Sequence, residues 1–147
     1  MKIDDVLKSK FKTPQIRASV NVRYTSNFMA ARQNAFMSKF ELTMPQFNIL
    51  RILRGAGEEI TVNTIKERMV EKSPNTTRLM DKLIDKGLIV RTRCSEDRRV
   101  VYIEITKNGL DLLLKIDEEF SAEDLLPNNL TDDECIMLSD LLDKLRG

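Results

Sequence analysis

The sequence has 147 residues, with 24 Lys and Arg against 23 Asp and Glu, 41% hydrophobic residues, and neither His nor Trp. This length and composition are typical of one folded domain, and the lack of His excludes His-dependent zinc sites and Ser-His-Asp triads. No apolar run approaches the roughly 18 residues that a membrane-spanning helix needs, and two cysteines favour a reducing compartment over a disulfide scaffold. We therefore expect a cytoplasmic protein with no membrane segment.

Helical periodicity dominates the first part of the chain. Residues 15–40 contain neither Gly nor Pro, and their apolar positions recur at helical spacing, which predicts one long helix. Thr43 and Gln46 form a capping box with Pro45 in the first turn, so the next helix is predicted to begin there. Two glycines are expected to end that helix, Gly55 and Gly57.

Two shorter helices are predicted before the pattern changes. Thr61 has the residue type and position to cap the first of them. Ser73 and Pro74 suit the N-cap and the first helical position, so the second helix is predicted over residues 73–86, and Gly87 is expected to end it.

The spacing changes from helical to alternating after residue 87. Residues 89–94 and residues 101–105 each alternate between two faces, which is typical of strands. The charged residues 95–99 lie between them. The pattern therefore predicts a two-stranded hairpin with a polar tip.

Two helices are predicted after the hairpin. Thr106 is expected to cap a helix that runs to about Phe120, and Thr131 and Glu134 form a second capping box. The last helix carries an apolar stripe that suits either a core within the chain or a partner subunit. The stripe consists of Leu138, Leu141, Leu142 and Leu145.

Short helices followed by a hairpin form a winged helix-turn-helix arrangement, so the predicted fold is mainly α with a small β-hairpin (α+β). The helix over residues 73–86 then takes the place of a recognition helix, whose N-terminal residues contact base edges in the major groove. Asn and Arg read adenine and guanine through paired hydrogen bonds, and an arginine on a narrow loop suits the minor groove. Residues 73–99 hold seven Lys and Arg against four Asp and Glu, so their net charge is +3. The residues predicted to contact DNA are Ser73, Asn75, Thr76, Thr77, Arg78, Lys82, Arg91, Arg98 and Arg99.

Three stretches carry motifs that occur together in one known family. Residues 97–109 contain a D-R-R wing, a strand and a helix start of the form L-T-x-x-G, with Ile105 in place of the leucine. Residues 77–91 match T-R-L-v-d-r-L-e-k-k-G-L-v-x-R, and residues 42–50 match L-T-x-x-Q-f-x-i-L. In this order the stretches resemble the MarR family (multiple antibiotic resistance regulators) of bacterial transcription regulators.

The resemblance implies a single-domain homodimer in which residues 1–40 and 107–147 form a helical dimerisation region and residues 41–106 form the winged helix-turn-helix. It implies a repressor, not an enzyme, that binds a pseudo-palindromic operator in double-stranded DNA. A small-molecule effector would release the operator, and no cofactor is implied. Carried over by position, Asp97 would brace the wing through a charge-assisted hydrogen bond and Arg99 would enter the minor groove.

Two features concern the signal that would release DNA. Tyr24, Phe28 and Met29 have a spacing that suits either helix core or an effector pocket. Some family members sense oxidants through a cysteine near the start of the first helix, and this chain has no cysteine before Cys94. Arginines near Cys94 would activate its thiol, and the alternative is a small apolar strand residue. We expect that Cys94 and Cys135 are not joined and that peroxide does not control DNA binding.

Two other classes of function stay open at this point. An enzyme would need clustered carboxylates or an activated nucleophile, but the acidic residues that open the last helix are explained by the helix dipole. These residues are Asp132, Asp133 and Glu134. A winged-helix adaptor that binds only protein fits the same pattern of elements, and a titration with duplex DNA separates it from a regulator.

Overall fold

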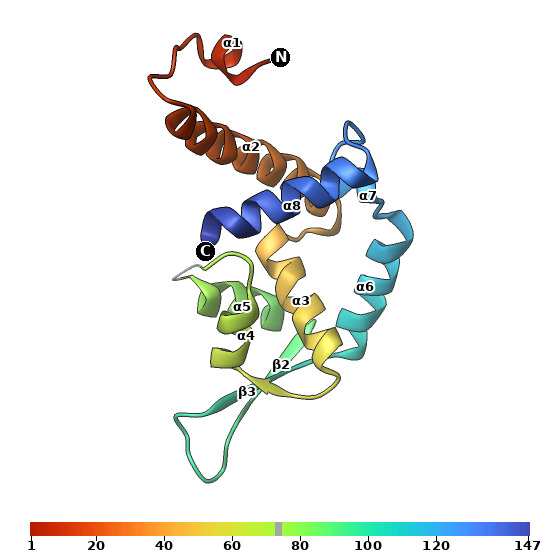
Figure 1. Cartoon of the computed structure of the whole chain (residues 1–147). Helices are drawn as coiled ribbons and strands as arrows, with labels where there is room; N and C mark the ends of the chain where they lie inside the picture. The colour runs from red at the N-terminus through yellow and green to blue at the C-terminus, as the bar shows by residue number, and fades with distance from the viewer. Residues whose placement is uncertain (73–74) are drawn as a thin grey trace. The chain divides into compact units, whose positions relative to one another are not determined.

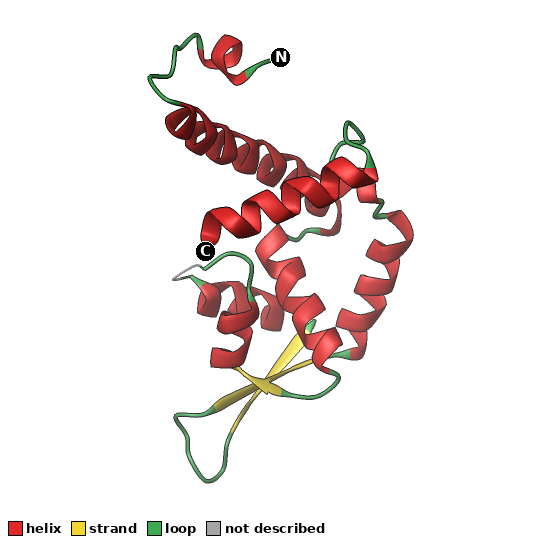
Figure 2. Cartoon of the chain, viewed as in Figure 1, coloured by secondary structure: helices red, strands yellow, loops and turns green. Residues whose placement is uncertain are grey.

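The computed structural model describes residues 1–72 and 75–147, and it is mainly helical with one small antiparallel sheet (Figures 1 and 2). The predicted fold class is confirmed. The chain divides into two compact units, one of residues 1–32 and 121–147 and the other of residues 33–120. The second unit extends beyond the predicted region 41–106 at both ends, because the end of the long helix and the helix after the hairpin contribute side chains to its core.

The first unit is built from the terminal helices. α8 begins at the predicted capping box, where Thr131 Oγ1 accepts a hydrogen bond from the backbone N–H of Glu134 at 3.3 Å. The sequence pattern does not predict α1 and α7, which are too short to show a helical period. The helices of this unit are α1 (Ile3–Leu7), most of α2 (Pro14–Met37), α7 (Ala122–Leu125) and α8 (Asp132–Arg146).

The second unit contains the predicted winged helix-turn-helix. Its elements are η1 (Ser38–Phe40), α3 (Met44–Ala56), β1 (Ile60–Thr61), α4 (Val62–Arg68), α5 (Thr76–Asp85), β2 (Ile89–Arg93), β3 (Val101–Ile105) and α6 (Lys107–Glu119). The strand order is β1-β3-β2 and all pairs are antiparallel. Ile89 lies opposite Ile105 and Arg93 opposite Val101, so the predicted hairpin is confirmed. The sequence does not predict β1, because two residues are too few to show the alternation of a strand.

Local sequence signals set most of the helix ends. The capping box of Thr43 and Gln46 opens α3, and Thr61 caps α4, as predicted. α3 runs through Gly55 and ends at Gly57, whose φ of 69° is left-handed. The prediction that Gly55 ends the helix is therefore wrong. A glycine inside a helix costs only about 1 kcal/mol relative to alanine, and the buried apolar face of α3 offsets that cost.

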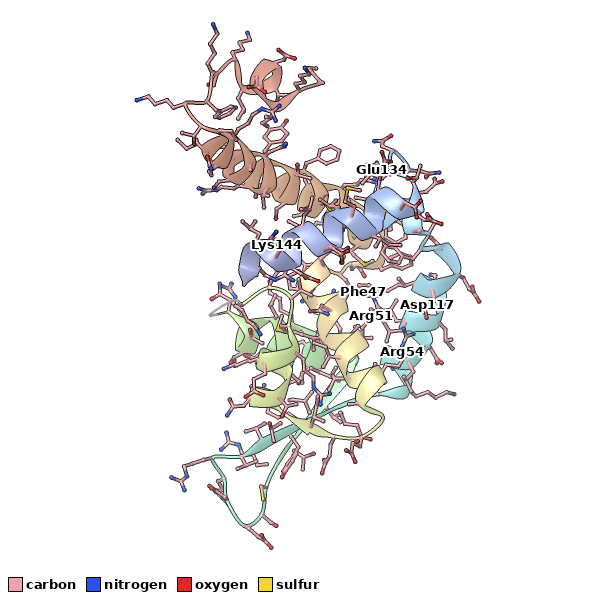
Figure 3. The ribbon with its side chains drawn as sticks, in the orientation of Figure 1. Phe47, Arg51, Arg54, Asp117, Glu134 and Lys144 are labelled. Atoms are coloured by element: carbon pink, nitrogen blue, oxygen red, sulfur yellow. The ribbon has the colours of Figure 1, made fainter. Side chains whose placement is uncertain are left out.

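α3 lies at the centre of the core of the second unit. Phe47 packs edge-on against Phe120 with 5.7 Å between ring centroids. At the surface, Arg54 Nη1 lies 2.6 Å from Asp117 Oδ2, so an ion pair also joins α3 to α6 (Figure 3). The side chains that are almost completely buried come from every layer of this unit: Ile49, Leu50, Leu53, Ile65, Leu83, Ile89, Ile103, Leu113 and Ile116.

The start of α6 lies against the turn that follows α5. Thr106 donates from its backbone N–H to Leu88 O at 3.0 Å and from Oγ1 to Gly87 O at 2.6 Å. A Cβ atom added to Gly109 would lie 2.6 Å from Ile105 Cγ1 and would overlap Leu88 O. Only glycine fits at position 109, because the atom that a side chain would meet is a backbone carbonyl.

We predict that Gly109→Ala lowers the free energy of unfolding by about 1–3 kcal/mol, as overpacking does. Gly55→Ala is the matched control, because Gly55 is also helical but nothing lies within 4 Å of the place that its Cβ would take. The control is expected to raise the free energy of unfolding by about 0.5–1 kcal/mol through helix propensity. Urea unfolding at one fixed protein concentration measures both, and equal stabilities for the two variants would contradict the close approach.

Candidate nucleic-acid interface

The recognition helix α5 separates a buried face from a polar face. Met80 and Leu83 are buried, whereas Thr77, Arg78 and Lys82 are exposed. Asn75, also exposed, is the residue immediately before the helix. These side chains of the helix are thus open to solvent, as the sequence predicts.

The prediction that Thr76 lies on the exposed face is wrong. Its side chain is 2% exposed and its hydroxyl donates to Met69 Sδ at 3.7 Å. The reason is helical spacing, because Thr76, Met80 and Leu83 fall on one face and the apolar residues carry that face into the core. The other predicted contact at this end, Ser73, lies outside the described residues, as does Pro74.

The segment that leads into α5 is held by α3. The backbone N–H of Val70 donates to Asn48 Oδ1 at 3.0 Å, and Met69 is buried in the core. Asn48 therefore holds the chain at Val70, just after α4. Asn48 cannot be predicted as a contact from the sequence, since an asparagine in an amphipathic helix carries no signal about its partner.

The wing tip is organised around one carboxylate. Asp97 Oδ1 accepts hydrogen bonds from the backbone N–H of Arg99 at 3.0 Å and from its Nε at 3.1 Å, and Asp97 Oδ2 accepts from Arg99 Nη2 at 3.3 Å. The Arg99 guanidinium, and then the Arg99 backbone N–H, hold the pKa of the Asp97 carboxyl below its ordinary value. The Arg99 side chain nevertheless remains 92% exposed. Its head group is thus oriented and still accessible.

The wing loop between β2 and β3 extends away from the helices of its unit (Figure 2). Arg98 in this loop is exposed, whereas Arg91 on β2 forms an ion pair with Asp81 on α5. Thr77, Arg91 and Arg99 line one hollow of about 320 Å³. The structure therefore brings the recognition helix and the wing together around this hollow.

Residues at the start of α4 join the same hollow. Thr61, Val62 and Asn63 line it. The sequence predicts only a helix start at this segment, because a cap signal says nothing about which surface the cap adjoins.

The residues of the predicted effector pocket lie on α2 in the first unit. Tyr24 and Phe28 are exposed and Met29 is half-buried. The effector pocket remains a prediction.

Cys94 and Cys135 are both free thiols. Over the described residues, no group of acidic or thiol side chains suited to a metal ion occurs and no helix is long and apolar enough to cross a membrane.

A polar recognition helix beside a basic hairpin, on a scaffold of three helices and a small sheet, defines a winged helix-turn-helix protein. The model of the MarR family matches residues 42–101. The multiple antibiotic resistance protein MarR of Salmonella typhimurium is 32% identical over 115 residues, which are 76% of this chain and 78% of that protein. The chain therefore belongs to the MarR family of transcription regulators and is a DNA-binding transcriptional regulator.

Two further comparisons agree with this assignment. An uncharacterized HTH-type transcriptional regulator of Bacillus subtilis, YfiV, is 37% identical over 71 residues, which are 48% of this chain but only 44% of that protein. Among solved structures, a mutant of MarR from E. coli complexed with operator DNA is similar with a TM-score of 0.78 at 26% identity. That match covers 93% of this chain and 99% of the E. coli chain.

Proposed function

We propose that this protein is a homodimeric repressor that acts in the cytoplasm, binds a pseudo-palindromic operator in double-stranded DNA and is released by a small-molecule effector. The observation that carries the proposal is the exposed polar face of α5 next to a wing arginine that is oriented yet accessible. The E. coli relative bound to operator DNA supports the same mode of binding.

In this proposal the two parts of the interface have different tasks. Asn75, Thr77 and Arg78 read base edges in the major groove, where each base pair presents a distinct pattern of donors and acceptors. Arg99 enters the minor groove, where the negative potential is strongest over narrow A·T-rich DNA. Contacts to phosphates complete the interface and fix its register. They come from Ser73, Lys82 and Arg98.

We predict that Arg78→Ala weakens binding to the operator by about 5- to 150-fold, which corresponds to the roughly 1–3 kcal/mol of a good paired base contact. Binding to a scrambled duplex is expected to fall much less, because that duplex offers no specific contact to lose. Lys115→Ala removes the same charge from an exposed position on α6 and is the control. Affinities for both duplexes measure the effect, and a parent-like operator affinity of Arg78→Ala would remove this residue from the interface.

Removing the Asp97 carboxylate has two opposite expected effects on DNA binding: the loss of a negative charge strengthens it, and the loss of the contact to Arg99 weakens it. Asp97→Ala and Glu96→Ala each remove one negative charge from the same loop, and only Asp97 holds Arg99. Electrostatics alone predicts tighter binding for both variants. We expect Glu96→Ala to bind slightly more tightly than the parent and Asp97→Ala to bind more weakly, because Arg99 loses its orientation. Tighter binding by Asp97→Ala would show that the carboxylate does not brace the wing.

Dimerisation is proposed for the regions 1–40 and 107–147. α8 has no buried residue, and several of its large apolar side chains are exposed. A run of exposed apolar residues on one helix marks a surface that another protein covers, and symmetric dimers are the commonest solution. The exposed residues are Ile136, Met137, Leu138, Leu141 and Leu145.

We predict that Leu141→Glu combined with Leu145→Glu converts the dimer to a monomer and abolishes tight operator binding, because both half-sites must be engaged together. These substitutions remove no core contact, since both leucines are more than half exposed in the single chain. Ser139→Glu, at an exposed polar position of the same helix, is the control and is expected to remain dimeric. Analytical ultracentrifugation distinguishes the states, and an unchanged dimer in the double variant would contradict this interface.

The operator used in these tests is the duplex that the parent protein selects from a random-sequence pool. A parent protein that selects no duplex would overturn the proposed function.

A further inference from the structure

Arg91 and Asp81 connect the wing to the recognition helix. Arg91, on β2, donates from Nη2 to Asp81 Oδ1 on α5. Their side chains are 36% and 50% exposed, and both lie in the unit of residues 33–120. The guanidinium of Arg91 is therefore engaged with a carboxylate, and the Arg91 side chain is far less exposed than that of Arg99, which is 92% exposed.

The hollow beside this pair explains why the contact matters. Thr77 and Met80 of α5 line one part of it, and Arg91, Val101 and Ile103 of the hairpin line another. Atoms that face a hollow lack packing partners on that side, so they contribute little to fixing the positions of the elements. On the side of the hollow, the packing between the helix and the hairpin is therefore incomplete.

Apart from this pair, α5 and the hairpin are joined through the core, in which Met80, Leu83 and Ile89 are buried. The chain turns at Gly87 and Leu88, where the hydrogen bonds of Thr106 hold it. The core packs one side of this junction, and the hollow lies on another side of it. The ion pair adds a further connection, from the middle of β2 to the middle of α5.

We propose that Arg91 is a positioning residue whose ion pair with Asp81 sets the angle between the recognition helix and the wing. With this angle set, the major-groove contacts of α5 and the minor-groove contact of the wing are made on the same duplex at once. This inference rests on the proposed function, and it replaces the direct DNA contact that the sequence predicts for Arg91.

The position of Asp81 gives the proposal its sharpest consequence. A carboxylate on the exposed side of a recognition helix repels phosphates, so its removal strengthens binding to any duplex if charge alone matters. If the carboxylate holds Arg91, its removal weakens binding to the operator relative to other DNA. The two explanations thus predict opposite changes in sequence preference.

The experiment compares Asp81→Asn, Arg91→Gln and the double variant with the parent. Each protein is titrated with the duplex that the parent selects from a random-sequence pool and with a scrambled duplex of the same composition, at two salt concentrations. The readouts are the ratio of the two affinities and the slope of log affinity against log salt concentration.

Each single variant is expected to lower the affinity ratio by about 1.5- to 5-fold, the range that a partly exposed ion pair supports. The double variant is expected to lower the affinity ratio no further than one single variant does, because the effects of substitutions at two residues that act as a pair are not additive. The salt slope of Arg91→Gln on the scrambled duplex is expected to equal that of the parent, since no phosphate contact is lost.

Two control variants carry the same charge changes without breaking the pair. Arg93→Gln changes a residue on the same face of β2, and Asp85→Asn changes one on the next turn of α5. Within the described ranges neither residue has an ion-pair partner. Both controls are expected to leave the affinity ratio unchanged.

Two outcomes would overturn the inference while leaving the proposed function intact. If Arg91→Gln reduces the slope of log affinity against log salt concentration by about one, and weakens binding to both duplexes equally, Arg91 contacts a phosphate. If Asp81→Asn binds the operator more strongly and the ratio of the two affinities is unchanged, Asp81 acts only by repelling phosphates. By contrast, a parent that binds no duplex would overturn the proposed function itself.

Discussion

The DNA-binding unit depends on the close approach between the end of α5 and the start of α6. Thr106 carries three bonds at this point: its backbone N–H donates to Leu88 O, its hydroxyl donates to Gly87 O, and the same hydroxyl accepts from the backbone N–H of Gly109. One residue therefore ends the hairpin, caps the next helix and holds the end of the recognition helix. The arrangement is possible only because Gly109 has no side chain to meet Leu88 O.

The parts of the fold that can be predicted from sequence are those with a local physical signal. Capping boxes, helical period and strand alternation each depend on neighbours a few residues away, and they locate α3, α4, α6, α8 and the hairpin. β1, α1 and α7 cannot be located in this way, because two to five residues are too few to show a period. The prediction for Thr76 is wrong for a related reason: a threonine suits either face, and only the burial of its helix neighbours decides.

The partners of exposed side chains cannot be predicted either. Arg91 and Asp81 are ten residues apart on different elements, and nothing in their spacing indicates that they meet. Asn48 lies 22 residues from the backbone N–H that it holds. Asp97 and Arg99 are the exception, because they are two residues apart and the family resemblance singles them out. Contacts between elements follow from the fold, whereas contacts within a tight loop follow from the sequence.

These contacts change how the basic charge of residues 73–99 should be understood. Asp81 and Asp97 neutralise Arg91 and Arg99, and Lys86 donates to the backbone carbonyl of Glu41. Attraction to phosphates falls when a cation is paired, yet pairing also fixes the cation in one place before DNA arrives. Ordering a long side chain costs up to about 2 kcal/mol, so Arg99, which Asp97 orders in advance, loses less conformational freedom on binding DNA. The ion pairs of this interface thus lower the attraction to phosphates, which is the same for every duplex. They also fix the relative positions of the helix and the wing, which favours a duplex whose grooves have the matching spacing.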